Sequence, residues 1–168
     1  MTPQLHFQEF ADTSSVKDFA IHAVRMFNSN DKHELPAVNL YEPVVSHRIA
    51  VYLEILFTGY AVDCEYNKNV SNAHDQYKRS LEGRKIRPDI IVHKRNDSTQ
   101  NLLVVEVKKA GKDSEKGRAD IMRIKESFRQ SNLSYCYGMF VGVLRSRIDV
   151  VWVSFDAGEP EEYYEVIK

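Results

Sequence analysis

The sequence predicts an α/β domain in which helices flank a mixed β-sheet, and three observations lead to this prediction. Two stretches with apolar residues at helical spacing come first, and short apolar runs of strand length follow them. A further stretch of helical spacing then separates the third strand-like run from those near the C-terminus. The expected order is helix, helix, three strands, helix and two or three strands, which is typical of a sheet with helices on its faces.

The two N-terminal helices are predicted from their apolar stripes and end signals. Ser14 or Ser15 can cap the first helix, which is expected at about 14–28. Pro43 can open the second helix, and Gly59 stops it. The apolar stripe of this second helix consists of Val45, Ile49, Tyr52, Leu53 and Leu56. Both helices are therefore expected to pack on the sheet.

Three strands are expected in the middle of the chain. Alternating apolar and polar residues predict the first at 60–67, and the polar composition of 68–85 indicates a long turn or a mobile loop. Two apolar runs follow, DIIVHKR at 89–95 and NLLVVEVKK at 101–109, joined by the polar connection NDSTQN. These two runs should pair as an antiparallel hairpin.

The C-terminal part is expected to contain one helix and the last strands. The stretch 111–117 begins and ends with glycine and breaks the strand pattern, and helical spacing resumes over 118–130. The exposed face of this helix should be basic, through Arg123, Lys125 and Arg129. The final strands, at about 135–144 and 148–167, would extend one edge of the sheet.

The length of 168 residues fits one compact domain, 1–168, with its core at about 42–144. No apolar run approaches the roughly 18 residues needed to cross a bilayer, and the N-terminus lacks the basic start and apolar centre of a signal peptide. A cytoplasmic protein with no membrane partner is therefore expected. Cys64 and Cys136 belong to no cluster with metal-ligand spacing, so we expect them to be buried thiols.

The net charge of -1 hides an uneven distribution along the chain. Residues 78–129 carry fifteen Lys and Arg against eight Asp and Glu, which leaves eight against sixteen elsewhere. A phosphate-binding face would give such a basic middle between acidic ends, although solvated helix faces give similar runs. The distribution therefore keeps a nucleic-acid partner open despite the acidic sum.

The clearest chemical signal lies at 87–109. Asp89 opens one predicted strand, and Glu106 and Lys108 stand two apart near the end of the next, so alternation places both on one face. Charged residues are costly to bury on a covered strand unless each has a partner or a metal. Pairing of the two strands would bring Asp89 within a residue or two of Glu106, so the two carboxylates should converge.

Two convergent carboxylates supply the hard oxygen ligands that Mg²⁺ or Mn²⁺ prefers, and the carbonyl of Val107 could add a third. Such a metal lowers the pKa of a bound water and stabilises negative charge on a phosphoryl oxygen. Lys108 could orient that water or neutralise the phosphate. The sequence therefore predicts a divalent-metal site with Asp89, Glu106 and Lys108 as its catalytic core.

The motif at this site resembles that of a known nuclease superfamily. Pro88-Asp89, a gap of sixteen residues and Glu106-Val107-Lys108 are similar to the signature of the PD-(D/E)xK, or restriction-endonuclease-like, class. The expected core order α-β-β-β-α-β also resembles that class, and SHRIAVYLE and NLLVVEVKK are similar to segments of a prokaryotic and phage-associated group within it. The resemblance implies a Mg²⁺- or Mn²⁺-dependent endonuclease that hydrolyses phosphodiester bonds, with DNA as the first candidate substrate.

The resemblance also implies further site residues. Members often add a glutamate from the first core helix, and a helical wheel favours Glu42, on the stripe facing the sheet, over Glu54, which points to solvent. Pro43 places Glu42 at the helix cap, where it would also favour the helix dipole. His47 is a further candidate for proton donation or phosphate contact, with a packed core role as the alternative. Independently of the resemblance, four basic residues could touch the nucleic-acid backbone, with a solvated surface charge as the alternative for each: Arg87, Lys109, Arg123 and Lys125.

Two other interpretations remain open, and the oligomeric state, a homodimer included, is not fixed by the sequence. In one, the chain has a nuclease-like fold that binds nucleic acid or a protein without cutting. In the other, Glu106 and Lys108 form a surface pair in a structural or regulatory domain, and Asp89 is a turn residue. NTPase, serine-hydrolase and zinc-protease functions lack support, because no glycine-rich phosphate loop, GxSxG or HExxH occurs.

Overall fold

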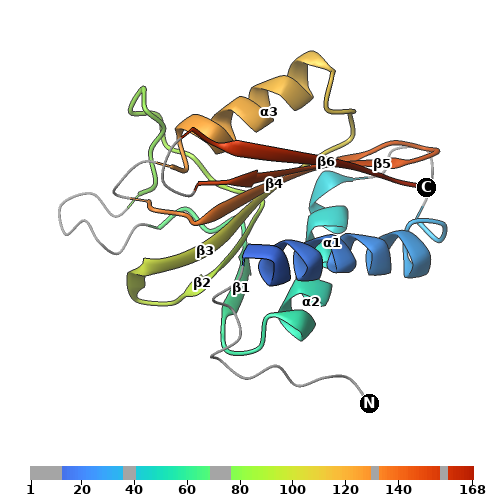
Figure 1. The fold of residues 1–168 in the computed structure, drawn as a ribbon, viewed down its shortest axis with the longest axis horizontal. Coiled ribbons are helices and arrows are strands. Elements are labelled where there is room, and N and C mark those ends of the chain that lie inside the picture. Colours follow the sequence, from blue (N-terminus) through green and yellow to red (C-terminus); the bar gives the residue numbers. More distant parts are fainter. Residues whose placement is uncertain (1–12, 36–40, 69–76, 130–132, 156–158) are drawn as a thin grey trace.

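The computed structural model describes residues 13–35, 41–68, 77–129, 133–155 and 159–168. Within these residues the chain forms three helices and six strands (Figure 1). In chain order they are α1 (Thr13–Asn30), α2 (Glu42–Leu56), β1 (Ala61–Cys64), β2 (Ile90–Lys94), β3 (Asp97–Lys108), α3 (Glu115–Glu126), β4 (Tyr137–Val143), β5 (Ile148–Ser154) and β6 (Glu161–Ile167). No helix in this described part has the length and apolar character needed to cross a membrane.

The six strands form one sheet whose spatial order, β1 to β6, follows the sequence. Neighbouring strands pair antiparallel except β3 and β4, which run parallel. This parallel pair needs a crossover, and α3 provides it. The mixed sheet with helices confirms the predicted α/β class, and β5 and β6 extend one edge as expected.

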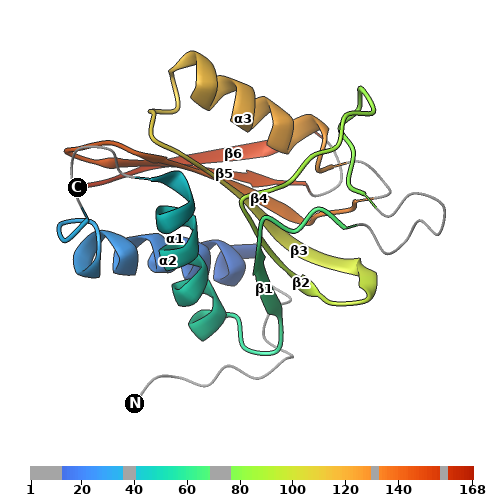
Figure 2. The ribbon, with the colours of Figure 1, turned by 180° about the vertical axis from the view of Figure 1, so that it is seen from behind.

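The helices divide between the two faces of the sheet, with α1 and α2 on one and α3 on the other (Figure 2). The larger apolar core lies under α1 and α2 and includes Phe27, Leu53 and Leu103. The smaller core lies under α3 and includes Val104 and Ile124. Successive residues of β3 therefore enter opposite cores, as the pleat of a strand requires.

The described part of the chain places α3 close against β4. A Cβ added at Gly138 of β4 would lie 2.2 Å from Cγ2 of Ile124 on α3. Real side chains do not approach so closely, so the absence of a side chain at Gly138 sets the distance between helix and sheet. This short distance brings the polar side chains of α3 within reach of β3.

Several predicted helix boundaries are corrected by the structure. Ser14 and Ser15 lie inside α1, so neither is its N-cap. The third helix begins at Glu115 rather than near 118, because the Ser114 hydroxyl accepts a hydrogen bond from the Gly117 N–H at 3.0 Å. This side-chain cap offsets the low helix propensity of glycine, which had suggested a break.

The predicted connections and cysteines also need correction. Most of NDSTQN belongs to β3, because the chain turns tightly at Arg95 and Asn96, where Asn96 has a φ of 65°. Cys64 and Cys136 are exposed, not buried. The described part of the predicted loop 68–85 contains paired backbone, with bridges from Lys68 to Tyr77 and from Arg79 to Lys85.

Candidate functional site

The site begins where β2 ends and β3 continues. The ladder between these strands ends at the pair Ile90–Val105, which places Asp89 opposite Glu106. Beyond that point Oδ2 of Asp89 accepts a hydrogen bond from the Val107 N–H at 2.7 Å. The carboxylate thus replaces the backbone carbonyl that would accept this bond if β2 were longer. Because the N–H and C=O of one extended residue point to the same side, the Val107 carbonyl faces the same open edge.

An irregularity in the hairpin produces this juxtaposition. Next to the turn Lys94 pairs with Asp97, and a regular ladder from there would place Asp89 opposite Leu102. Register shifts on either side of His93 displace the pairing, so that Asp89 faces Glu106 instead. The prediction that strand pairing brings Asp89 within a residue or two of Glu106 is therefore confirmed.

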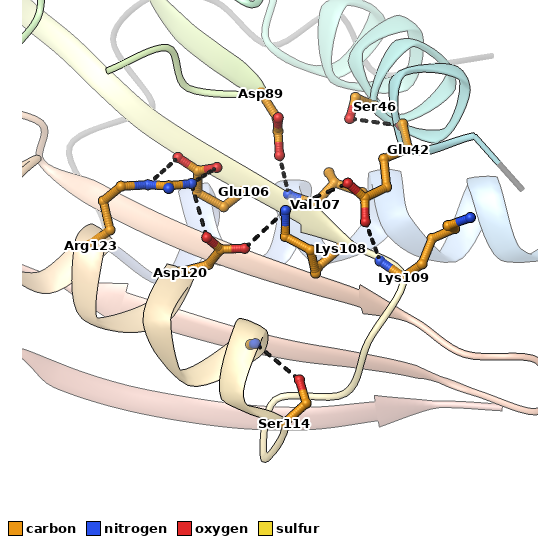
Figure 3. A network of polar contacts seen from close by, with 11 residues as sticks. Glu42, Ser46, Asp89, Glu106, Val107, Lys108, Lys109, Ser114, Asp120 and Arg123 are labelled. Carbon is orange, nitrogen blue, oxygen red and sulfur yellow. Dashed lines mark hydrogen bonds and ion pairs between the residues drawn. The ribbon is translucent and has the colours of Figure 1, made fainter. Parts of the chain in front are cut away.

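Glu106 lies in a buried ion pair with a residue of α3 (Figure 3). Its side chain is 1% exposed, and Nη2 of Arg123 donates to Oε2 at 2.6 Å while Nε donates to Oε1 at 3.3 Å. The prediction that Arg123 belongs to an exposed basic face is wrong, because α3 lies close enough to the sheet for Arg123 to reach Glu106. Arg123 is thus a member of the site.

Lys108 lies between two further carboxylates. Its Nζ is 3.4 Å from Oδ2 of Asp120 and 3.5 Å from Oε2 of Glu42. Its side chain is 24% exposed, so Lys108 is only partly buried. Glu106 and Lys108 lie on the α3 side of β3, as alternation predicted.

Glu42 joins the site from the opposite face of the sheet. It is the first residue of α2, and its Oε1 accepts a hydrogen bond from the Lys109 N–H at 3.0 Å (Figure 3). The same carboxylate stands in the first turn of a helix, where negative charge is favoured. Glu54, the other candidate, is exposed.

Asp120 of α3 is the site residue that sequence reasoning missed. It is 5% exposed and contacts Lys108 at 3.4 Å and Arg123 at 3.0 Å. Its Oδ2 is buried and accepts no hydrogen bond in the described part of the chain. The signal was available, because Asp120 precedes Ile124 by one helical turn and therefore lies on the buried stripe of that helix.

Burial and charge shift the pKa values of these groups. Burial raises the pKa of Glu106 to about 8, against the opposing effect of the Arg123 guanidinium. Burial also raises the pKa of Asp89, against its hydrogen bond from Val107. Burial acts to lower the pKa of Lys108, but the surrounding carboxylates outweigh it, so the pKa is raised and the side chain stays protonated.

The donor set fits a divalent cation in type and charge. Four carboxylates meet two cationic side chains, so with every group ionised the cluster has two excess negative charges: Glu42, Asp89, Glu106 and Asp120 against Lys108 and Arg123. Carboxylate and carbonyl oxygens suit Mg²⁺ or Mn²⁺. Among the described residues no three acidic, histidine or cysteine side chains are already grouped as ligands, since the Glu106 oxygens face Arg123.

The remaining predicted residues lie at the surface. His47 is exposed on α2, which differs from the packed alternative. Arg87 is exposed and lies 3.3 Å from the Glu65 carboxylate. The side chain of Lys109 is exposed, and Lys125 forms an ion pair with Glu162 of β6. The structure thus brings none of these four side chains into the Asp89–Glu106–Lys108 cluster.

Comparisons of the chain with models of protein families, with curated proteins and with solved structures give no match.

Proposed function

We propose that the chain is a divalent-metal-dependent endonuclease of the PD-(D/E)xK, restriction-endonuclease-like class, acting on DNA. The observation that carries the proposal is the convergence of Asp89, Glu106 and Lys108 at adjoining ends of β2 and β3. In support of the proposal, the elements from α2 to β4 follow one another in the order α-β-β-β-α-β, although α1 before them and β5 and β6 after them are additional elements. A structural domain has no need for this many charges at one partly buried point.

The proposed roles follow from the positions of the side chains. Asp89, Glu106 and the Val107 carbonyl would hold Mg²⁺ or Mn²⁺, which supplies charge stabilisation and a bound water of lowered pKa. Lys108 remains protonated and exposed enough to meet a phosphate oxygen. Glu42 and Asp120 hold the Lys108 ammonium from two sides and so position it.

The test is cleavage of supercoiled plasmid, linear duplex, single-stranded DNA and RNA with Mg²⁺ or Mn²⁺, with EDTA as the negative control. Asp89→Asn and Lys108→Ala should each lower the rate at least ~100-fold, the usual cost of removing one group that stabilises the transition state. Glu42→Ala should lower the rate, whereas Glu54→Ala, an exposed acid on the same helix, serves as its matched control.

Calorimetry with Mn²⁺ on the same proteins separates the outcomes further. Wild-type protein should bind Mn²⁺, and Asp89→Asn should bind it more weakly. Absence of both cleavage and Asp89-dependent metal binding would contradict the nuclease proposal.

A second candidate is a catalytically inactive nuclease-like domain that binds nucleic acid or a protein. The observation that favours it is the ion pair at 2.6 Å, because Arg123 contacts both carboxylate oxygens of Glu106, the atoms that a metal would need. Under this alternative, Arg123→Met should create Mn²⁺ affinity that the wild type lacks. Under the nuclease proposal the wild type binds Mn²⁺ without this change.

A further inference from the structure

A small hairpin precedes the site in the chain and is defined by its backbone hydrogen bonds. The Ile86 N–H donates to the Lys78 carbonyl at 2.9 Å, and the Ser80 N–H donates to the Arg84 carbonyl at 2.8 Å. At the tip the Gly83 N–H donates to the Ser80 carbonyl at 2.9 Å, and Gly83 has a φ of 78°, which glycine adopts without strain. We name residues 78–86 the 78–86 hairpin.

The base of the 78–86 hairpin is anchored in the protein. Lys78 is 3% exposed, and its ammonium donates to the main-chain carbonyls of Lys68 at 2.6 Å and Tyr66 at 3.3 Å. The same ammonium lies 4.5 Å from the centre of the Tyr66 ring. Ile86 packs against the core under α3. These contacts fix the direction in which the hairpin projects.

The tip and sides of the 78–86 hairpin present an unusual combination of side chains. Leu81 stands at the tip and is 62% exposed. Apart from the buried Lys78, residues 77–87 contain four Lys and Arg that are at least partly exposed, and one acidic residue. Arg84 contacts the one acidic residue, Glu82, at 3.3 Å, but both side chains are more than two-thirds exposed, so this pair is weak. The surface is therefore an apolar point surrounded by positive charge.

The 78–86 hairpin stands beside the site on the α3 side of the sheet. It projects next to the C-terminal end of α3, and the two residues Arg87 and Pro88 join it directly to Asp89 (Figure 1). A nucleic acid bound at the Asp89–Glu106–Lys108 cluster would therefore pass close to the hairpin.

We propose that the 78–86 hairpin docks in a groove of duplex nucleic acid, with Leu81 inserted at a base step and Arg84 and Lys85 on the flanking phosphates. Two-stranded ribbons enter the major or the minor groove, and apolar side chains inserted between base steps from the minor groove act as wedges that unstack bases. The cations supply the sequence-independent part of the affinity. This inference rests on the proposed nuclease function and names its substrate as duplex.

A single-stranded substrate fits this surface less well. Binding of single strands relies on aromatic faces on which successive bases stack. The two tyrosines at the base of the hairpin already carry ammonium groups on their rings, Lys78 over Tyr66 and both Lys68 and Lys85 over Tyr77. The single aliphatic side chain at the tip, Leu81, would separate stacked bases, and regular stacking is a property of the duplex.

The experiment measures binding of a fluorescent 20-base-pair duplex by anisotropy in EDTA, across a series of salt concentrations. The double variant Arg84→Ala/Lys85→Ala should weaken binding at least ~10-fold and reduce the slope of log K against log salt by about 2, or ~0.9 for each phosphate contact. The matched control is Lys116→Ala/Arg145→Ala, which removes one Lys and one Arg that are exposed elsewhere. It should retain both the wild-type affinity and the wild-type slope.

The wedge is tested with 2-aminopurine placed in the duplex. Wild-type protein should raise its fluorescence through unstacking, and Leu81→Ala should abolish the rise while keeping the salt slope. Equal duplex affinity for the hairpin variant, the control and the wild type overturns the proposal, as does preference of the wild type for single strands. An unchanged fluorescence rise with Leu81→Ala overturns the wedge.

The assay in EDTA distinguishes failure of this inference from failure of the nuclease proposal. If the protein cleaves with metal but its duplex binding does not depend on the hairpin, only the inference about the hairpin fails. If duplex binding depends on the hairpin but the protein neither cleaves nor binds metal, the nuclease proposal fails and the role of the hairpin in duplex binding is supported.

Discussion

The two faces of the sheet bury different kinds of side chain. Under α1 and α2 the core is made of aliphatic and aromatic residues. On the α3 side the described chain buries five charged or imidazole side chains, which are Lys78, His93, Glu106, Asp120 and Asp149. Burial of such groups costs free energy unless each is paired. The comparison indicates that one face gains stability from apolar burial, whereas the α3 face must pair each buried charge to avoid a loss of stability.

The largest expected effect tests the apolar face. Phe27 of α1 is fully buried, and Phe27→Ala should lower the free energy of unfolding by about 3–5 kcal/mol, through lost transfer energy and a cavity. Urea denaturation measures the change. Ile55→Ala, at a side chain of α2 that is 51% exposed, is the control and should change stability by less than about 0.5 kcal/mol. A loss below ~1 kcal/mol for Phe27→Ala would contradict the role given to this face.

The next effect tests the ion pair on the α3 face. Arg123→Met leaves the buried Glu106 without its cation and should cost about 3 kcal/mol. Adding Glu106→Leu to the same protein should restore more than half of that loss, because two apolar groups replace a buried pair. Denaturation midpoints of the single and double variants decide the matter. A double variant no more stable than Arg123→Met would show that the pair itself stabilises the fold.

A smaller effect tests the close packing of α3. Gly138→Ala forces Ile124 away from the sheet and should cost about 1–3 kcal/mol by overpacking. Ala119→Ser, at an exposed position of the same helix, should stay within about 0.5 kcal/mol. Thermal unfolding compares the two. Equal melting temperatures would mean that α3 shifts without resistance.

The smallest effect is a pH dependence due to His93. Burial lowers the pKa of His93 below its ordinary value of 6.5, although the hydrogen bond with Asp63 at 2.8 Å acts to raise it, and the nearby cations Lys78 and Arg95 lower it further. The unfolded chain therefore takes up a proton first, so stability is present above about pH 6.5 and is lost as the pH falls towards the lowered value. Urea midpoints at pH 7.5 and 5 should differ more for wild type than for His93→Phe. Identical changes of the urea midpoint with pH in the two proteins would exclude His93 as the source of the pH dependence.

Much of the fold was predictable because it depends on local patterns. Helical spacing and alternation identified the helices and strands, and the alternation of β3 assigned Glu106 and Lys108 to one face. Boundaries were less predictable, since they depend on single hydrogen bonds such as that of the Ser114 hydroxyl. The hairpin register depended on bulges near His93 that no residue type announces.

The site was predictable where it lies on the strands and not where it comes from α3. Asp89, Glu106 and Lys108 follow from sequence order and strand pairing. Asp120 and Arg123 reach the site only because α3 lies close to Gly138, and that distance is a tertiary property. Arg123 was therefore assigned to solvent, which is the usual place for a charged residue on a helix, and Asp120 was not identified.

Pro88 limits the hydrogen bonds that a longer β2 could make with β3 beyond Asp89. In the observed register a longer β2 would place Pro88 opposite Val107. Proline has no N–H, so even a continued ladder could not engage the Val107 carbonyl. A substitution elsewhere in β2 cannot supply a hydrogen bond to the Val107 carbonyl, whereas replacing Pro88 with a residue that has an N–H can. Pro88 thus keeps the Val107 carbonyl available as an acceptor, which it would not be if another residue continued the ladder at this position.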